Sequence, residues 1–143
     1  MNGDEISKIG YRRRVDDMRL PLEHGTPASR ARRMAERALQ GWNLSDRADD
    51  VLLVTTELVQ NVTQHTDDGG ELRMSLDGDS ILVEVTDTNP RMPLLQQPAP
   101  GRVGGRGMLL IAGVARAWGS RPAAWAGRTG KTVWAKIAAR LPH

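Results

Sequence analysis

Two polar side chains, spaced one helical turn apart, are the residues of this chain best suited to chemistry. Glu57 and Asn61 stand four positions apart, so they stack on one side of a helix, and His65 continues the row. At about 100° per residue, their neighbours form one apolar arc, made of Ala48, Val51, Leu52, Leu58, Val59 and Val62. A carboxylate and a carboxamide beside such an arc can hold a hydrated Mg²⁺ and orient a nucleophile. A solvated helix edge with an ordinary polar pair explains the same residues equally well.

A glycine cluster that opens a helical pattern is the second chemical feature. Glycines occupy positions 101, 104, 105 and 107, and apolar residues follow at 108, 110, 111, 114, 115 and 118. Glycine lets backbone amides approach an anion closely, and the start of a helix directs free N–H groups and a positive dipole end to the same place. The alternative is a flexible loop that leads into a glycine-rich helix start.

Two better-known phosphate-binding motifs are absent. Residues 127–132 resemble the end of a Walker A loop, but position 125 is Trp where that motif requires glycine, and 133–137 read as a strand instead of a helix. The dinucleotide pattern G-x-G-x-x-G fails because its third position is Leu110. These motifs therefore indicate neither a P-loop nor a Rossmann protein.

Four motifs, in order, resemble those of the GHKL ATPase superfamily, which includes DNA gyrase and the sensor histidine kinases. Glu57-Leu-Val-Gln-Asn61-Val-Thr-Gln-His65 resembles the N box, Val85-Thr-Asp87-Thr-Asn-Pro90 a reduced G1 box, Gly104-Gly-Arg-Gly-Met-Leu-Leu-Ile111 the G2 box, and Gly130-Lys-Thr-Val-Trp134 the last-strand motif. The similarity runs from about residue 17 to about residue 139. Order, spacing and short length most resemble the stand-alone branch, the anti-sigma-factor serine kinases of stress-response and sporulation pathways.

The resemblance implies a role for each matching residue. Glu57 would be the general base that polarises the attacking hydroxyl of a protein serine or of water. Asn61 would ligate the Mg²⁺ that bridges the phosphates of ATP, and Asp87 would accept a hydrogen bond from the adenine amino group and so select adenine over guanine. The other implied nucleotide-binding residues are His65, Pro93, Gly104, Gly105, Arg106, Gly107, Met108 and Thr132. Residues 105–108 would wrap the phosphates, and Thr132 would lie near the base or its bridging water.

The chain departs from the superfamily pattern in the G1 box. Asn89 and Arg91 stand where the wider superfamily has glycines. The stand-alone branch often lacks these glycines too.

Composition predicts one cytoplasmic domain without disulfides. A chain of 143 residues suits a single domain, large enough to bury about 70% of its unfolded surface. No apolar run approaches the roughly 20 residues of a membrane span, and no signal-peptide core is present. Zero cysteines exclude disulfides and thiolate catalysis, and the three histidines are too scattered for a metal site.

The net charge of +3 does not favour nucleic-acid binding. Of the 20 basic residues only three are lysines, a bias that a GC-rich genome explains more simply than phosphate binding. The densest helical cluster, Arg30, Arg32, Arg33 and Arg37, lies opposite an apolar stripe and therefore reads as a solvated face. The chain also has few of the aromatic residues on which single strands stack.

Periodicity predicts the order of the elements. Thr26 and Pro27 predict a helix start, cap and then first turn, for a helix to about residue 41, and Ser45 is the predicted cap of a second helix that carries Glu57 and Asn61. A polar arm covers 1–15. Alternating apolar residues predict strands around 18–22, 72–76 and 81–85, with a hairpin turn at 77–79. A helix at 105–117 and two strands, about 119–126 and 131–139, complete the chain.

A stretch rich in proline and glycine separates these strands from the last helix. Prolines occupy positions 90, 93, 98 and 100, which is typical of a linker between domains. Only about 40 residues follow, too few for a second core, so a mobile lid at about 88–104 fits better. The predicted fold is α/β, an α+β two-layer sandwich of the Bergerat type. A mixed, mainly antiparallel sheet is covered on one face by three helices within a single histidine-kinase-like ATPase domain at 16–143.

Three functions from different classes remain open. The first is an ATP- and Mg²⁺-dependent serine/threonine kinase that binds a sigma factor and phosphorylates a STAS-type anti-anti-sigma protein. The second is a nucleotide-sensing module that binds a partner without phosphoryl transfer. The third, an ATPase subunit that drives a larger assembly, is disfavoured because no transducer domain follows residue 139. The weakly apolar first strand, and the resemblance, further predict a homodimer.

Overall fold

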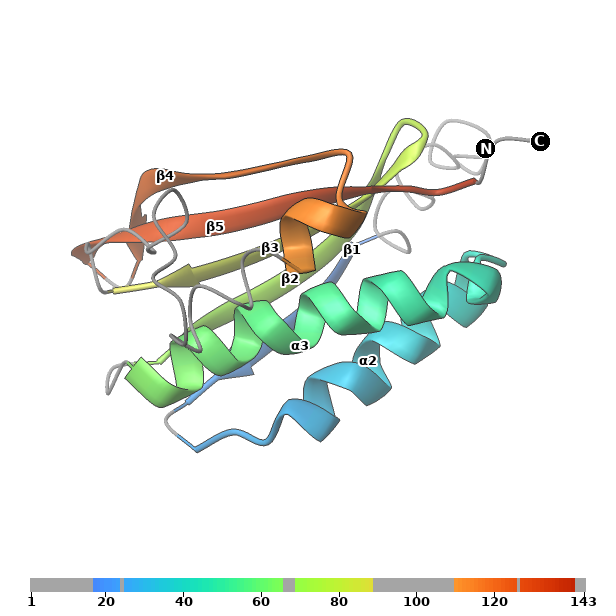
Figure 1. The fold of residues 1–143 in the computed structure, drawn as a ribbon. Helices are drawn as coiled ribbons and strands as arrows, with labels where there is room; N and C mark the ends of the chain where they lie inside the picture. Colours follow the sequence, from blue (N-terminus) through green and yellow to red (C-terminus); the bar gives the residue numbers. More distant parts are fainter. Residues whose placement is uncertain (1–16, 24, 66–68, 89–109, 126, 141–143) are drawn as a thin grey trace, which may run out of the picture.

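One antiparallel sheet and a layer of helices make up the chain (Figure 1). The computed structural model describes residues 17–23, 25–65, 69–88, 110–125 and 127–140. The strands are β1 (Asp17–Leu22), β2 (Gly70–Asp77), β3 (Ser80–Asp87), β4 (Ala117–Trp125) and β5 (Arg128–Ala138), in the order β1-β2-β3-β5-β4. The helices are α2 (Ala28–Gly41), the short 3₁₀ helix η1 (Ser45–Arg47) and α3 (Ala48–His65). All four pairings of these strands are antiparallel, where the sequence predicted a mixed, mainly antiparallel sheet.

The helices cover one face of the sheet, as expected from the alternation of apolar residues. On β3 the buried residues Ile81, Val83 and Val85 lie on the helix side, and on β5 the row is Val133, Ala135 and Ile137. The helices contribute Ala31, Ala35 and Leu39 of α2, and Val51, Val54, Leu58, Val59 and Val62 of α3. Ile111, in the helical stretch 110–114, joins the same core. The two-layer α/β prediction is therefore confirmed.

The opposite face of the sheet carries charged side chains held in ion pairs. Glu84 is buried to 7% exposure, and its carboxylate lies 3.2 Å from Arg73 and 2.7 Å from Arg121. Arg73 also donates to Asp17 of β1 at 3.0 Å, and this hydrogen bond raises the pKa of the Arg73 guanidinium. These contacts join strands β1, β2, β3 and β4 across their outer face.

The helix starts differ from the predicted caps. Pro27 has an extended backbone and is the cap of α2, so the helix begins at Ala28, one residue later than expected. The hydroxyl oxygen of Thr26 instead accepts a hydrogen bond from the Glu23 backbone N–H at 2.8 Å and so organises the preceding turn. Ser45 is the first residue of η1 and provides no side-chain cap.

The start of α3 is fixed by a buried arginine that the sequence did not single out. Arg47 Nε donates to the backbone oxygen of Ala138 at 2.8 Å, and its Nη2 donates to Asp50 at 3.0 Å. The side chain therefore ties the beginning of the helix layer to the end of β5. The contact with Ala138 joins residues 91 positions apart, so periodicity alone does not reveal it, whereas the contact with Asp50 is an ordinary i,i+3 pair.

The hairpin and the closing strands follow the prediction with shifted ends. Asp77 pairs with Ser80 across a two-residue turn, in which Gly78 has a positive φ. Of the helix predicted at 105–117, the structure describes 110–114 as helical. The helix ends there, and β4 begins at Ala117. Within the described residues no helix combines the length and apolar character that crossing a bilayer requires. The predicted arm and nearly all of the predicted lid lie outside the described residues.

Thr55 provides a test of the packing. It lies on the core arc of α3, is fully buried, and its hydroxyl has no hydrogen-bond partner within the described residues. An unsatisfied buried hydroxyl costs about 1–3 kcal/mol, so Thr55→Val, which keeps the shape, should stabilise the fold by an amount up to that range. Urea unfolding followed by circular dichroism measures the change. Thr56→Val, at the half-buried neighbouring position, is the control and should shift stability by less than about 0.5 kcal/mol.

Candidate functional site

A buried carboxylate ends the row of core residues on β3. Ile81, Val83 and Val85 alternate along the helix-facing side of this strand, and Asp87 occupies the next position of the same row. Its side chain is 4% exposed. A charged group is expensive to bury, and the core does not require one at this position. Asp87 is therefore a candidate for binding, as the sequence predicted.

Lys131 of β5 is the partner of Asp87 and was missed as a site residue. Its Nζ lies 3.1 Å from Oδ1 and 3.0 Å from Oδ2 of Asp87, and its side chain is 9% exposed. Asp87 and Lys131 are directly opposite each other in the register of β3 and β5. The signal was present in the sequence, because Lys131 stands two positions before Val133 and so belongs to the same inward row.

Thr132 lies on the other face of the sheet. Its hydroxyl is 2.7 Å from that of Thr86, and these two residues pair across β3 and β5 one position away from Asp87 and Lys131. Successive side chains of a strand point to opposite faces, so Thr132 and Asp87 face away from each other. The expectation that Thr132 lies beside the same base as Asp87 disagrees with this register. Lys131 holds the position next to the carboxylate.

Gly130 lets the two strands approach at this point. A Cβ built on Gly130 would overlap the backbone oxygen of Asp87. Any larger residue would push β5 away from β3 and separate Lys131 from its carboxylate. The glycine of the last-strand motif thus has a steric role in the site.

Glu57 and Asn61 lie on the edge of α3, as predicted. Both are half-buried, while Val54, Leu58 and Val62 beside them are buried in the core. His65 is the last residue of α3. Pro93, Gly104, Gly105, Arg106, Gly107 and Met108 lie outside the described residues. No group of three or more His, Asp or Glu side chains in the described ranges is arranged to hold a metal ion.

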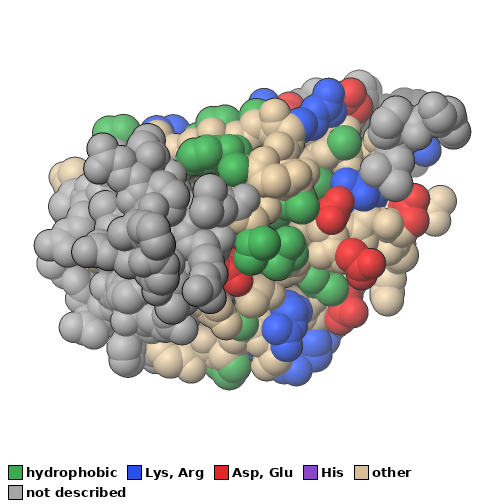
Figure 2. All heavy atoms as spheres, viewed as in Figure 1, with side chains coloured by type: hydrophobic (Ala, Val, Ile, Leu, Met, Phe, Trp, Pro, Cys, Tyr) green, Lys and Arg blue, Asp and Glu red, His purple; other side chains and the backbone are tan. Residues whose placement is uncertain are grey.

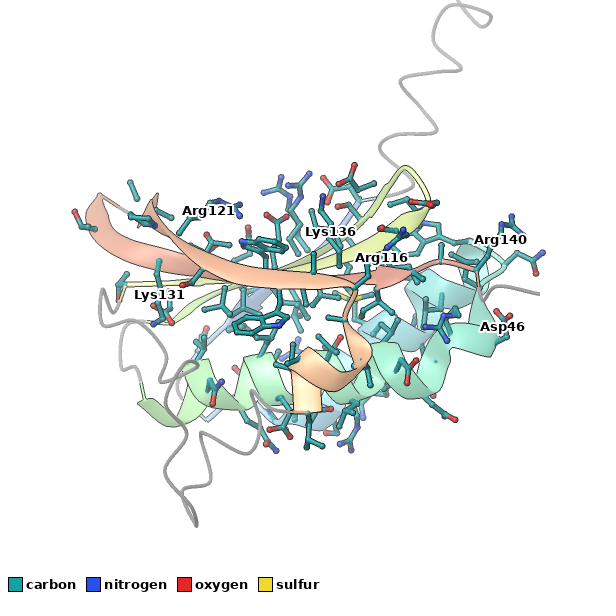
Figure 3. The ribbon with its side chains drawn as sticks, turned by 45° about the horizontal axis from the view of Figure 1, so that its top comes forward. Asp46, Arg116, Arg121, Lys131, Lys136 and Arg140 are labelled. Atoms are coloured by element: carbon teal, nitrogen blue, oxygen red, sulfur yellow. The ribbon has the colours of Figure 1, made fainter. Side chains whose placement is uncertain are left out.

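The carboxyl end of α3, the helix that carries Glu57 and Asn61, lies at the same end of the domain as the Asp87–Lys131 pair. The carboxyl end of α3, the end of β3 and the beginning of β5 lie together at the left of Figure 1. Pairing supports this placement, because Asp87 is opposite Gly70, which follows the end of α3 by five positions. Figure 3 shows Lys131 on the helix side of the sheet, and Arg121 and Lys136 on the opposite side. A carboxylate, an ammonium group and the polar helix edge thus share one side of the sheet.

The arginines of α2 form a surface away from these residues. Arg30, Arg32, Arg33 and Arg37 are exposed, as predicted for a solvated helix face. Acidic side chains lie beside basic ones on this side of the molecule (Figure 2). The prediction that no nucleic acid binds stays a prediction.

Comparisons with known proteins give one family. A model of the histidine kinase-like ATPase domain matches residues 24–137. A solved structure, the histidine kinase domain from the Erythrobacter litoralis EL346 blue-light activated histidine kinase, is 21% identical with a TM-score of 0.46. The match covers 82% of this chain and 63% of that one, so the chain spans less than two thirds of the kinase domain's length. No curated protein matches the chain.

The opposite placement of Thr132 and Asp87 predicts separable effects. Thr132→Val removes the hydroxyl contact with Thr86 and should lower the free energy of unfolding by about 1 kcal/mol. Adenine-nucleotide affinity should change less than twofold, because the side chain is on the outer face. Calorimetric titration and urea unfolding of the same preparation measure both quantities. A tenfold loss of nucleotide affinity with unchanged stability would contradict this placement and show that Thr132 contacts the nucleotide.

Proposed function

Because the chain belongs to the family of histidine kinase-like ATPase domains, within the GHKL superfamily, we propose that it is an ATP-binding regulatory protein with serine/threonine kinase activity. The substrate proposed is a STAS-type anti-anti-sigma protein, and a sigma factor is the second partner. The observation that carries the ATP part is the buried carboxylate of Asp87, which lies at the end of the domain toward which the second half of α3, with Glu57 and Asn61, runs.

The described residues fit an adenine nucleotide. Asp87 is an acceptor in a nearly dry environment, where a hydrogen bond from an amino group is worth more than in water. Asn61 supplies an amide oxygen, a ligand type that Mg²⁺ accepts alongside phosphate oxygens and water. When bound, ATP would supply the transferable phosphoryl group.

Glu57 is the proposed general base. It lies one helical turn before Asn61 and is half-buried, so its carboxylate can reach a hydroxyl held near a metal-bound phosphate. Its role would be to accept the proton of the attacking serine hydroxyl. In this proposal α3 supplies both the general base, Glu57, and the metal ligand, Asn61. Strand β3 supplies Asp87, which recognises adenine.

The partner proposals rest on the resemblance and on one structural feature. Among the described strands β1 pairs only with β2 and is an edge of the sheet. An unpaired strand edge offers backbone groups to a second chain, which supports a homodimer through β1. A cytoplasmic location and the two protein partners complete the proposal.

Nucleotide selectivity tests the ATP part. ATP or ADP with Mg²⁺ should bind in preference to GTP, and Asp87→Asn should weaken ATP binding tenfold to a hundredfold, as expected for about 1–3 kcal/mol lost with a buried hydrogen bond. Isothermal titration calorimetry measures the affinities. Asp77→Asn, at an exposed acid that ends β2, is the matched control and should bind ATP like the wild type. Equal affinity for ATP and GTP would sink the proposal.

Glu57→Gln separates a kinase from a nucleotide sensor. The substitution keeps the shape and removes the basicity, so ATP binding should persist while phosphoryl transfer to a STAS-type serine falls by about 10²–10⁴. Asn61→Ala should instead weaken Mg²⁺-ATP binding, because it removes a metal ligand. Transfer of labelled phosphate measures the first effect and calorimetry the second. Glu36→Gln, on the exposed face of α2, is the control and should change neither.

Two results would contradict the kinase mechanism. Unchanged transfer by Glu57→Gln would make Glu57 an ordinary polar helix edge. A wild-type protein that binds ATP and a partner, yet transfers phosphate to no candidate, would make the nucleotide-sensing module the correct function.

A further inference from the structure

The Asp87–Lys131 pair places a donor and an acceptor side by side in a nearly dry site. The ammonium nitrogen of Lys131 lies 3.1 Å and 3.0 Å from the two carboxylate oxygens of Asp87, with side chains 9% and 4% exposed. Both residues directly adjoin the buried apolar part of an inward row, namely 81, 83 and 85 on β3 and 133, 135 and 137 on β5. The pair therefore lies at the end of the apolar core, on the helix-facing side of the sheet.

Burying such a pair is not explained by stability alone. Desolvation of two charges offsets most of their attraction, and apolar residues of similar size often stabilise a core equally well. A contribution to ligand binding accounts for a charged pair at the end of two apolar rows. An ammonium group has three N–H donors and a carboxylate about four lone-pair sites, so each can contact a ligand as well as the other.

The pair is complementary to one edge of adenine. Adenine presents an amino donor at position 6 beside a ring-nitrogen acceptor at position 1. A carboxylate opposite the amino group and an ammonium opposite the ring nitrogen satisfy both. Guanine in the same orientation would place its carbonyl oxygen against Asp87 and its N1–H against Lys131, so acceptor would face acceptor and donor would face donor.

We propose that Lys131 is a second base-reading residue, whose ammonium donates a hydrogen bond to N1 of adenine while Asp87 accepts one from the 6-amino group. This inference rests on the proposed ATP binding and adds a specificity-determining residue to it. Thr132 cannot take this role from its place on the outer face, where it contacts Thr86.

The test compares ATP with 1-deaza-ATP, in which N1 is replaced by C–H, on the full chain by calorimetry. The wild type should bind 1-deaza-ATP about tenfold to a hundredfold more weakly, the effect of a hydrogen bond with a charged donor. Lys131→Met should lose a similar factor for ATP and bind the two nucleotides equally. The coupling between the substitution and the missing nitrogen identifies the contact.

Lys136→Met is the matched control. Lys136 lies on the same strand but on the outer face, where it pairs with Asp77 at 3.1 Å (Figure 3). Its substitution should preserve both ATP affinity and the preference over 1-deaza-ATP. Lys131→Gln is the second variant if Lys131→Met does not fold, because its amide can still donate to the buried carboxylate. It should bind ATP more weakly and discriminate less than the wild type.

The outcomes separate this inference from the proposed function. ATP binding with equal affinity for 1-deaza-ATP would overturn the role of Lys131 and leave the ATP assignment standing. A Lys131 variant that still discriminates like the wild type, or that binds ATP more tightly, would also overturn it, since Lys131 would then be a structural or blocking residue. Absence of any binding of ATP or ADP would overturn both.

Discussion

Burial of one face of the sheet against α2 and α3 is the constraint on which the rest of this structure depends. It requires apolar residues at alternate positions in the middle of β2, β3 and β5, and this alternation also decides which other side chains of these strands reach the helix layer. Asp87 and Lys131 reach that layer because they stand in register with the apolar rows. The candidate site is thus an extension of the core pattern beyond its last apolar residues.

The two faces of the sheet handle charge in different ways. On the outer face Glu84 is shared between Arg73 and Arg121, whose side chains are 39% and 52% exposed, so solvent screens the pairs and each contributes little alone. On the inner face the pair of Asp87 and Lys131 is almost free of solvent. Loss of either inner partner would leave an uncompensated buried charge, which costs far more than breaking an outer pair.

The placement of chemistry follows from the rigidity of the elements that carry it. The buried residues of α3 hold this helix, and with it Glu57 and Asn61, against the sheet. Asp87 and Lys131 are held by the continuous antiparallel pairing of β3 and β5. Gly130 permits the close approach that this ladder needs. Side chains on helices and strands are positioned more precisely than side chains on loops, and this precision helps a site to discriminate between similar nucleobases.

The sequence by itself determined the elements, the inward rows and the polar edge of α3, because periods of 3.6 and 2 are local properties. Asp87 and Glu57 were predicted as site residues from their motifs, and their roles stay predictions. Only the tertiary structure decided that Lys131, and not Thr132, lies beside Asp87. That choice depends on the register of two strands whose paired residues are 44 positions apart, and a shift of one residue would exchange the faces. The contact of Arg47 with the backbone of Ala138, 91 positions away, was likewise decided by the tertiary structure.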